Sequence, residues 1–256
     1  MDIIPLFKSH YSLGRSILTL ASEPEPNGPD SIPQIAQENS LKEVYLVDDS
    51  MGGFLEAYSS LAKFKIKLIF GVRITVCQDL HKKNEASIQT SCKYIIFCKN
   101  KNGYKRLIKI YSQAAIEGFY YESRTDFESI KNNWSDKDLL LAVPFYDSFI
   151  FQNNFSSRGC VPDFSFCKPV LFVENNNLPY DHILKDLVED YASASKYEKV
   201  NTQSVFYKNK EDFKAYLTFR CINNRSTLEK PQLNNMSSDT FCFENWTNQG
   251  QEAANK

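Results

Sequence analysis

The chain has 256 residues, 42% of them apolar and 14% aromatic, which is enough to build the core of one domain of ordinary size. The formal net charge of −1 gives the whole chain no electrostatic attraction to nucleic acid or to an anionic membrane. No run of 18 apolar residues is present, so no membrane span is expected, and the first ten residues do not resemble a signal peptide.

The seven cysteines form no CxxC pair and are odd in number. This spacing predicts free thiols in a reducing compartment, hence a cytoplasmic protein, and gives no zinc site. The cysteines therefore predict no bound metal ion or cofactor.

The first forty residues begin with an apolar run at 3–7 that predicts a strand. Residues 9–22 suit a loop and a short helix, and the proline-rich stretch 23–30 breaks the chain. Asp30 or Ser31 can cap a helix that runs to about residue 40.

The central stretch, residues 42–76, reads as strand, acidic turn, helix and strand. Asp48 and Asp49 stand where the first strand ends, and Gly71 is expected to close the second strand. A unit of this length implies a crossover between parallel strands, and such folds place their chemistry at the carboxyl ends of the strands. Asp48, Asp49 and Arg73 are therefore candidate site residues.

The remaining elements continue the alternation of strands and helices. Strands are predicted at 93–98, 119–124, 139–143, 170–173 and 200–207, and helices at 104–117, 126–132, 179–191 and 211–222. Residues 78–91 are expected to be an exposed loop, and 147–168 an irregular lid or edge loop. Residues 224–256 are polar and predict a mobile tail after a domain of residues 1–223. The pattern predicts an α/β fold, either a barrel or a doubly wound sheet.

Three segments in a fixed order carry a family resemblance. They are SHYSLG with LVDD and KIKLIFGVRITV (9–76), CKNKNGYKRLIKIYSQAAIEGFYYESRTDFESI (98–130) and VNTQSVFYKNKEDFKAYLTFRCI (200–222). Together they resemble the PHP (polymerase and histidinol phosphatase) domain of the bacterial DNA polymerase III alpha subunit, over about residues 1–230. The resemblance implies a PHP-type distorted (β/α)7 barrel. A family member of this kind would hold two or three Zn or Mn ions with histidines and carboxylates and use them on phosphoesters.

The residues at the family's metal-ligand positions depart from that pattern. The two histidines of the first motif fall at Leu6 and Lys8, and the histidine after Asp48 is replaced by Asp49. Other ligand positions fall at Arg73, Lys93, 143–145 and Phe206. Cations and apolar side chains cannot bind a metal ion, so the resemblance with these departures implies a degenerate site with no metal and no cofactor.

Our hypothesis for this centre is a salt-bridge cluster in which Lys8, Arg73 and Lys93 supply positive charge to Asp48 and Asp49. Arg124 occupies an arginine position of the family and either buttresses the fold or lines the cleft. The predicted binding residues at the former metal centre are Lys8, Asp48, Asp49, Arg73, Lys93 and Arg124.

Three functions remain open. The first is a non-catalytic binding or scaffold module in DNA replication, with the polymerase core or the proofreading exonuclease as protein partner and the loop 147–167 as partner surface. The second is a metal-dependent phosphoesterase or 3′–5′ exonuclease with a site rebuilt from Asp48, Asp49 and His10. The third is a phosphate- or nucleotide-binding module that uses the cations at the former centre.

A basic stretch between Lys99 and Lys109 is either a DNA-binding face or a solvated helix face. No membrane partner is expected. No polymerase palm is recognised in these residues, so the chain is expected to be either a stand-alone subunit or a piece of a longer protein.

Overall fold

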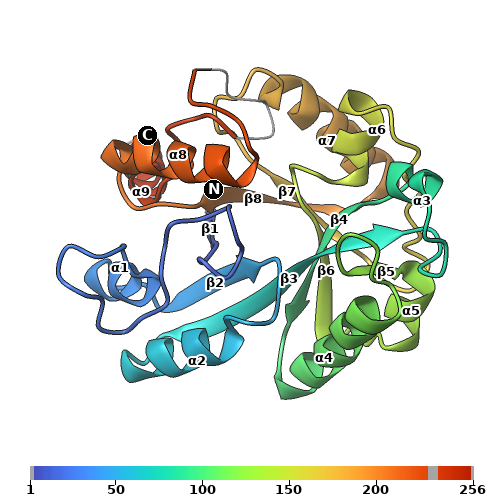
Figure 1. Ribbon diagram of the computed structural model, residues 1–256, viewed down its shortest axis with the longest axis horizontal. Coiled ribbons are helices and arrows are strands. Elements are labelled where there is room, and N and C mark those ends of the chain that lie inside the picture. Colours follow the sequence, from blue (N-terminus) through green and yellow to red (C-terminus); the bar gives the residue numbers. More distant parts are fainter. Residues whose placement is uncertain (1–2, 230–235, 255–256) are drawn as a thin grey trace. The chain divides into compact units, whose positions relative to one another are not determined.

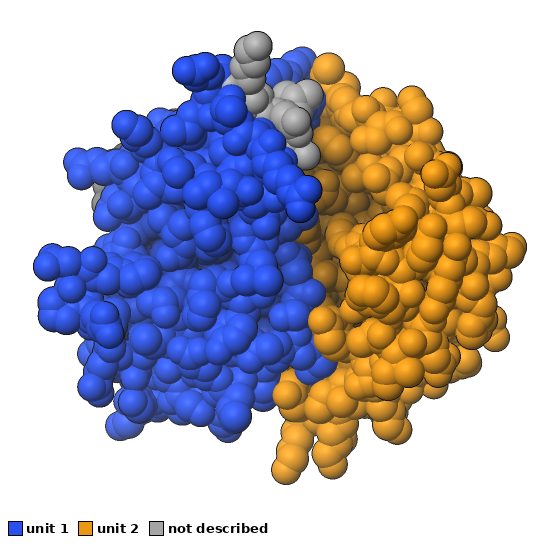
Figure 2. All heavy atoms as spheres, in the orientation of Figure 1, with its two compact units in different colours: residues 1–70, 174–182, 201–256 blue, residues 71–173, 183–200 orange. Residues whose placement is uncertain are grey.

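The computed structural model describes residues 3–229 and 236–254. The chain forms two compact units, which Figure 2 colours separately. Unit 1 comprises residues 1–70, 174–182 and 201–256, and unit 2 comprises residues 71–173 and 183–200. Within the described ranges, no helix combines the length and the apolar character needed to cross a membrane.

Unit 1 is built around the strands β1 (Ile4–Phe7), β2 (Glu43–Asp48) and the last part of β8 (Glu198–Val205), labelled in Figure 1. β1 pairs in parallel with both neighbours, so that Leu6 faces Tyr45 on one side and Ser204 on the other. The helices of this unit are α1 (Ile32–Glu38), α2 (Phe54–Lys63), α8 (Phe213–Asn223) and α9 (Phe243–Ala254), with a 3₁₀ turn at Lys210–Asp212. Because the strands are parallel, the residues that follow β1 and β2 meet at one edge.

Unit 2 has a mixed sheet. β3 (Lys67–Cys77), which begins in unit 1, pairs antiparallel with β4 (Cys92–Cys98) and parallel with β5 (Arg124–Asp126). β4 pairs antiparallel with β6 (Leu139–Val143), which pairs in parallel with β7 (Val170–Val173). The helices are α3 (Glu85–Gln89), α4 (Lys101–Ile116), α5 (Phe127–Asn132), α6 (Phe149–Phe155) and α7 (Asp181–Ser195), whose first two residues belong to unit 1.

Strands and helices alternate along the chain, so the predicted α/β class is confirmed. The predicted strands at 139–143 and 170–173 agree with β6 and β7 to the residue. Asp126 caps α5 as expected, because its side chain accepts a hydrogen bond from the Ser129 amide.

Several local expectations were wrong. β3 does not end at Gly71 but runs through it, because its pairing with β4 starts at Gly71 and continues to Val76. The missing side chain at Gly71 leaves room for the Phe97 ring. The loops predicted at 78–91 and 147–168 contain the short helices α3 and α6, each begun by a capping side chain, from Asn84 and Ser148. Residues 9–22 contain turns and no helix.

The predicted mobile tail, residues 224–256, is also corrected where the structure describes it. Residues 230–235, 255 and 256 lie outside the described residues. Phe241, Cys242 and Phe243 are buried, and the Trp246 indole donates to the Ile3 carbonyl oxygen at 2.7 Å. The segment packs into unit 1 because its few apolar residues are grouped ahead of and within α9.

Candidate functional site

Asp48 lies at the end of β2 in unit 1 and is fully buried. Its Oδ1 accepts hydrogen bonds from the Ser9 amide at 2.9 Å and the Ser12 hydroxyl at 2.8 Å. Its Oδ2 accepts one from the Ser9 hydroxyl at 2.7 Å. Three donors from the turn after β1 therefore hold both carboxylate oxygens, as a buried carboxylate requires.

Asp49 carries a different set of partners. Lys8 Nζ lies 3.1 Å from Asp49 Oδ1, and Arg15 Nε lies 3.2 Å from Asp49 Oδ2. The Asp49 amide donates to the Ser12 hydroxyl at 2.9 Å. Two cations thus face the Asp49 carboxylate.

His10 is exposed, and its ring packs against Tyr11 with the ring centroids 4.5 Å apart. Tyr11 in turn donates its hydroxyl proton to Glu56 at 2.8 Å, and this bond, with burial and nearby carboxylates, raises the pKa of Tyr11. The side chains that hydrogen-bond Asp48 are serines, so the structure does not bring His10 onto that carboxylate.

In unit 2, Arg73 and Lys93 find carboxylate partners of their own. Arg73 Nη1 lies 2.9 Å from Asp147 Oδ2, just beyond the end of β6. Lys93 donates to Glu122 and to the Thr75 hydroxyl, and Thr75 is its register partner on β3. We call these five residues the Arg73 cluster.

Glu122 shows the electrostatic balance of the Arg73 cluster. Burial raises the pKa of the Glu122 carboxyl, but the charge and hydrogen bond of Lys93 outweigh this effect, with help from Thr75 and Arg73. The net result is a pKa below the ordinary value, so the carboxyl is held in its charged form.

Arg124 lies in a separate cluster of unit 2. Its guanidinium is buried and donates to the Gly118 carbonyl at 3.2 Å, the Ser87 hydroxyl at 2.7 Å and the Lys82 carbonyl at 3.1 Å. The guanidinium carbon also lies 5.0 Å from the centroid of the Tyr120 ring. Of the two roles left open for Arg124, these contacts support the buttress, since they join three chain segments.

Sequence reasoning missed Glu174, a buried carboxyl of unit 1 that follows β7 directly. It accepts hydrogen bonds at 2.9 Å from the Ser204 amide, the Ser204 hydroxyl and the Asn176 side chain. Burial raises its pKa, although these hydrogen bonds oppose the shift. Glu174 directly follows a buried strand, and Asp48 lies at the end of one. The same sequence signal could therefore have identified Glu174 as a candidate site residue.

The donor set does not fit the metal centre that the family resemblance implies. Both oxygens of Asp48 are held by serine donors, and Asp49 faces two cations. Across residues 3–229 and 236–254, no group of three histidine, cysteine or carboxylate side chains is placed to share a metal ion. The described residues at this centre therefore do not fit the implied metal ions.

Comparison with known proteins gives one family and a consistent set of relatives. The family model for the PHP domain matches residues 27–202. The DNA polymerase III subunit alpha of Thermus aquaticus is 23% identical over 201 residues, which are 74% of this chain and 16% of that protein. The same subunit of Aquifex aeolicus is 25% identical over 230 residues, 84% of this chain and 19% of that protein. The chain thus spans less than a fifth of the length of these relatives.

Among solved structures, a candidate metal-dependent phosphoesterase from Bifidobacterium adolescentis is similar to this chain with a TM-score of 0.42 and 10% identity. The similarity covers 78% of this chain and 87% of that one.

Proposed function

This chain belongs to the PHP domain family, and we propose that it is a non-catalytic member that acts as a binding or scaffold module in DNA replication. The α/β fold of PHP type follows from the family match. The replication role is our inference from relatives that are DNA polymerase III alpha subunits.

The observation that carries the proposal is the hydrogen bonding of both Asp48 oxygens. A metal-binding carboxylate must offer lone pairs to the ion, whereas Asp48 uses two at Oδ1 and one at Oδ2 to accept hydrogen bonds from Ser9 and Ser12. Lys8 and Arg15 face the neighbouring carboxylate and supply the positive charge that a metal ion would otherwise bring. The centre then stabilises the fold rather than activating water.

A scaffold needs a partner, and we propose a protein of the replication complex, either the polymerase core or the proofreading exonuclease. The proposed partner surface is the segment 147–167, which contains α6 and the half-exposed Phe155 together with the exposed Val161. We place this role in the cytoplasm, because all seven cysteines are free thiols.

The test is metal content and Mn²⁺- or Zn²⁺-dependent hydrolysis of a phosphodiester and of single-stranded DNA by the purified chain. Asp48→Ala is the control for contaminating activity, and Asp48→Asn is a second variant in case the first does not fold. We expect no turnover above these controls. Stoichiometric metal with turnover that both variants lose would overturn the proposal in favour of a rebuilt phosphoesterase or exonuclease site.

The scaffold role is tested by mixing the chain with the polymerase core and the proofreading exonuclease of its source organism. Size-exclusion chromatography with light scattering measures complex formation. We expect a stable complex with one of them, weakened by Phe155→Asp and Val161→Asp and unaffected by Leu55→Asp on α2. Absence of a complex with both would contradict the scaffold role.

A further inference from the structure

Unit 2 contains a cavity of about 590 Å³ at the edge of its sheet where β4 ends and β6 and β7 begin. This is the opposite end of β4 from Lys93 and the Arg73 cluster. Its volume falls in the range of small-ligand sites. The lining residues come from four segments: Lys99, Trp134, Asp136, Leu139, Leu140, Leu141, Phe164, Ser165, Phe166, Cys167, Lys168 and Tyr197.

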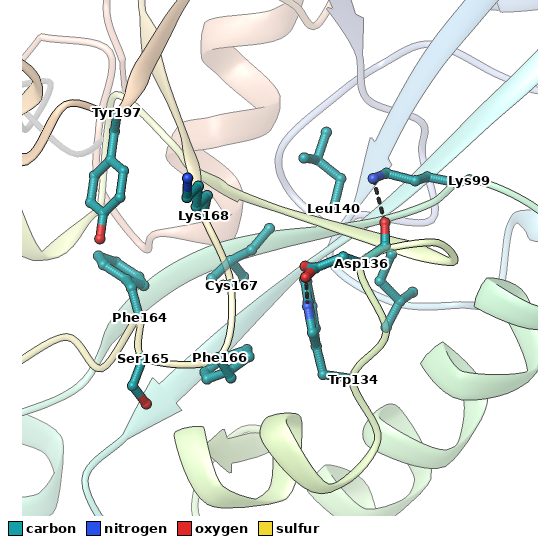
Figure 3. Close-up of a pocket in the computed structure, with 12 residues that line it drawn as sticks. Lys99, Trp134, Asp136, Leu140, Phe164, Ser165, Phe166, Cys167, Lys168 and Tyr197 are labelled. Carbon is teal, nitrogen blue, oxygen red and sulfur yellow. Dashed lines mark hydrogen bonds between the residues drawn. The ribbon is translucent and has the colours of Figure 1, made fainter.

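Aromatic rings make up much of the wall. Trp134 and Phe166 meet edge to face with ring centroids 5.3 Å apart, and Phe164 meets Tyr197 in the same way at 5.9 Å. All four rings are only half-buried, so ring surface is open to a ligand. In Figure 3 the rings of Trp134 and Phe166 lie below the amino groups of Lys99 and Lys168.

The aromatic wall is held in place before any ligand arrives. The Trp134 indole donates to Asp136 Oδ1 at 2.8 Å, which fixes the orientation of the ring. Phe164 packs edge to face on Tyr94 and Phe127 of the unit 2 core. A rigid wall of aromatic faces favours a planar ligand, since stacking then costs little ordering of the side chains.

Two lysines set the charge of the cavity. Lys99 Nζ donates to the Asp136 backbone carbonyl at 2.7 Å, a neutral acceptor, as the dashed line in Figure 3 shows. Within the described part of the chain, neither Lys99 nor Lys168 belongs to an ion pair. Two exposed ammonium groups beside an apolar wall favour an anionic group on the ligand, and lysine is a common phosphate binder.

Asp136 adds a hydrogen-bond acceptor next to Lys99. Its Oδ1 accepts from Trp134, and a carboxylate has further acceptor sites on both oxygens. The Cys167 thiol stays neutral beside it, because burial, with Asp136 and Asp163 nearby, raises its pKa to about 12. A ligand that matches these lining residues is planar and carries both an anionic group and an N–H donor.

We propose that this cavity binds a nucleotide whose base carries an exocyclic amino group. The base stacks on the Trp134 ring with its edge toward Phe166, the amino group donates to Asp136, and the phosphate is bound by Lys99 or Lys168. The nucleotide is either free or an unpaired residue of a single strand, since both present the same base and phosphate. An acidic peptide could satisfy the lysines, but it would match both the rings and Asp136 only if it also presented a tryptophan, tyrosine or histidine ring with its edge donor.

The experiment is isothermal titration calorimetry of the full chain at low salt with AMP as the probe. IMP replaces the amino group by a carbonyl, and adenosine lacks the phosphate, so we expect each to bind more weakly than AMP. A short single-stranded oligodeoxyadenylate is the second probe. Binding of AMP with competition by the oligonucleotide supports a shared site, and binding of the oligonucleotide alone assigns the site to an unpaired strand.

Variants locate the binding in the cavity. Lys168→Gln should weaken the affinity about tenfold, the value of one charge-assisted hydrogen bond. Lys185→Gln removes an exposed lysine of α7 outside the cavity and should change nothing. Trp134→Ala should abolish the preference for AMP over inorganic phosphate. Trp134→Phe is a second variant in case the alanine variant does not fold, and it should keep part of this preference.

The proposal is overturned if neither probe binds, or if Lys168→Gln and Lys185→Gln bind AMP equally well. It is also overturned if an acidic peptide containing phenylalanine binds in the cavity and AMP does not. Residues 164–167 belong both to the cavity and to the proposed partner surface. The two proposals are still tested separately, because complex formation is measured with Phe155→Asp and Val161→Asp, and neither residue lines the cavity.

Discussion

The hydroxyl of Ser12 joins Asp48 to the backbone of Asp49: it donates to Asp48 Oδ1 at 2.8 Å and accepts from the Asp49 amide at 2.9 Å. One side chain from the turn after β1 therefore fixes the end of β2. This arrangement lets the buried Asp48 carboxylate keep hydrogen-bond partners on both oxygens.

Ser12→Ala removes both hydrogen bonds at once. We expect the free energy of unfolding to fall by about 2 kcal/mol, because a buried acceptor and a buried amide each lose a partner. Urea unfolding measures the change. Ser59→Ala on the exposed face of α2 is the control and should stay within about 0.5 kcal/mol of wild type. Equal effects of the two substitutions would contradict this role of Ser12.

Lys8 and Arg15 contact the same carboxylate but differ in burial. The Lys8 side chain is 7% exposed and that of Arg15 33%. Double-mutant cycles with Lys8→Met, Arg15→Met and Asp49→Asn should therefore give a coupling of about 1.5 kcal/mol for Lys8–Asp49 and about 0.5 kcal/mol for Arg15–Asp49. A larger coupling for the exposed pair would show that burial does not set the strength of these ion pairs.

Glu122 should make stability depend on pH in a defined direction. Its pKa is lowered in the folded chain, so its pairing with Lys93 stabilises the fold above the ordinary carboxyl pKa of 4.5. This stabilisation is lost as the pH falls through the lowered value. The difference in unfolding free energy between wild type and Glu122→Gln should therefore shrink as the pH falls. Glu198→Gln, at an exposed position in β8, is the control, and its difference from wild type should not shrink in this way.

The strands, and the acidic residues at their ends, could be predicted from the sequence, because the spacing of apolar residues and the identity of the flanking residues are local signals. Asp48 was found in this way, and β6 and β7 were placed to the residue. The partners of these acids could not be found, since Ser9 and Ser12 reach Asp48 across 39 and 36 positions of sequence. Likewise, only the pairing of β3 with β4 reveals that Thr75 and Lys93 are neighbours. Short helices such as α3 were not predicted, because five residues are too few to show the helical spacing of apolar residues.

Arg124→Lys tests the buttress role. A lysine cannot reach the three acceptors that the guanidinium holds, so we expect a loss of about 3 kcal/mol in the free energy of unfolding. Arg225→Lys, at an exposed position, is the matched control and should change stability by less than about 0.5 kcal/mol. A fully stable Arg124→Lys variant would reopen the alternative that Arg124 lines a cleft.

Phe243 decides whether the last described segment is part of the fold. Its ring stacks on Phe7 of β1 with centroids 5.7 Å apart and contacts the Trp246 ring in a tilted arrangement at 5.2 Å. Its amide donates to the Tyr207 carbonyl at 3.0 Å. Phe243→Ala should lower the free energy of unfolding by about 3.5 kcal/mol, because it empties a buried site between β1 and α9.

Leu55→Ala on α2, where the leucine is 72% exposed, is the control for removing an apolar side chain of similar size. It should leave stability within about 0.5 kcal/mol. If Phe243→Ala behaved like Leu55→Ala, the segment would contribute no stability to unit 1, as the composition of residues 224–256 alone suggests. The grouping of Phe241, Cys242, Phe243 and Trp246 argues for the larger loss, because a polar segment needs only a few adjacent apolar residues to anchor it to a core.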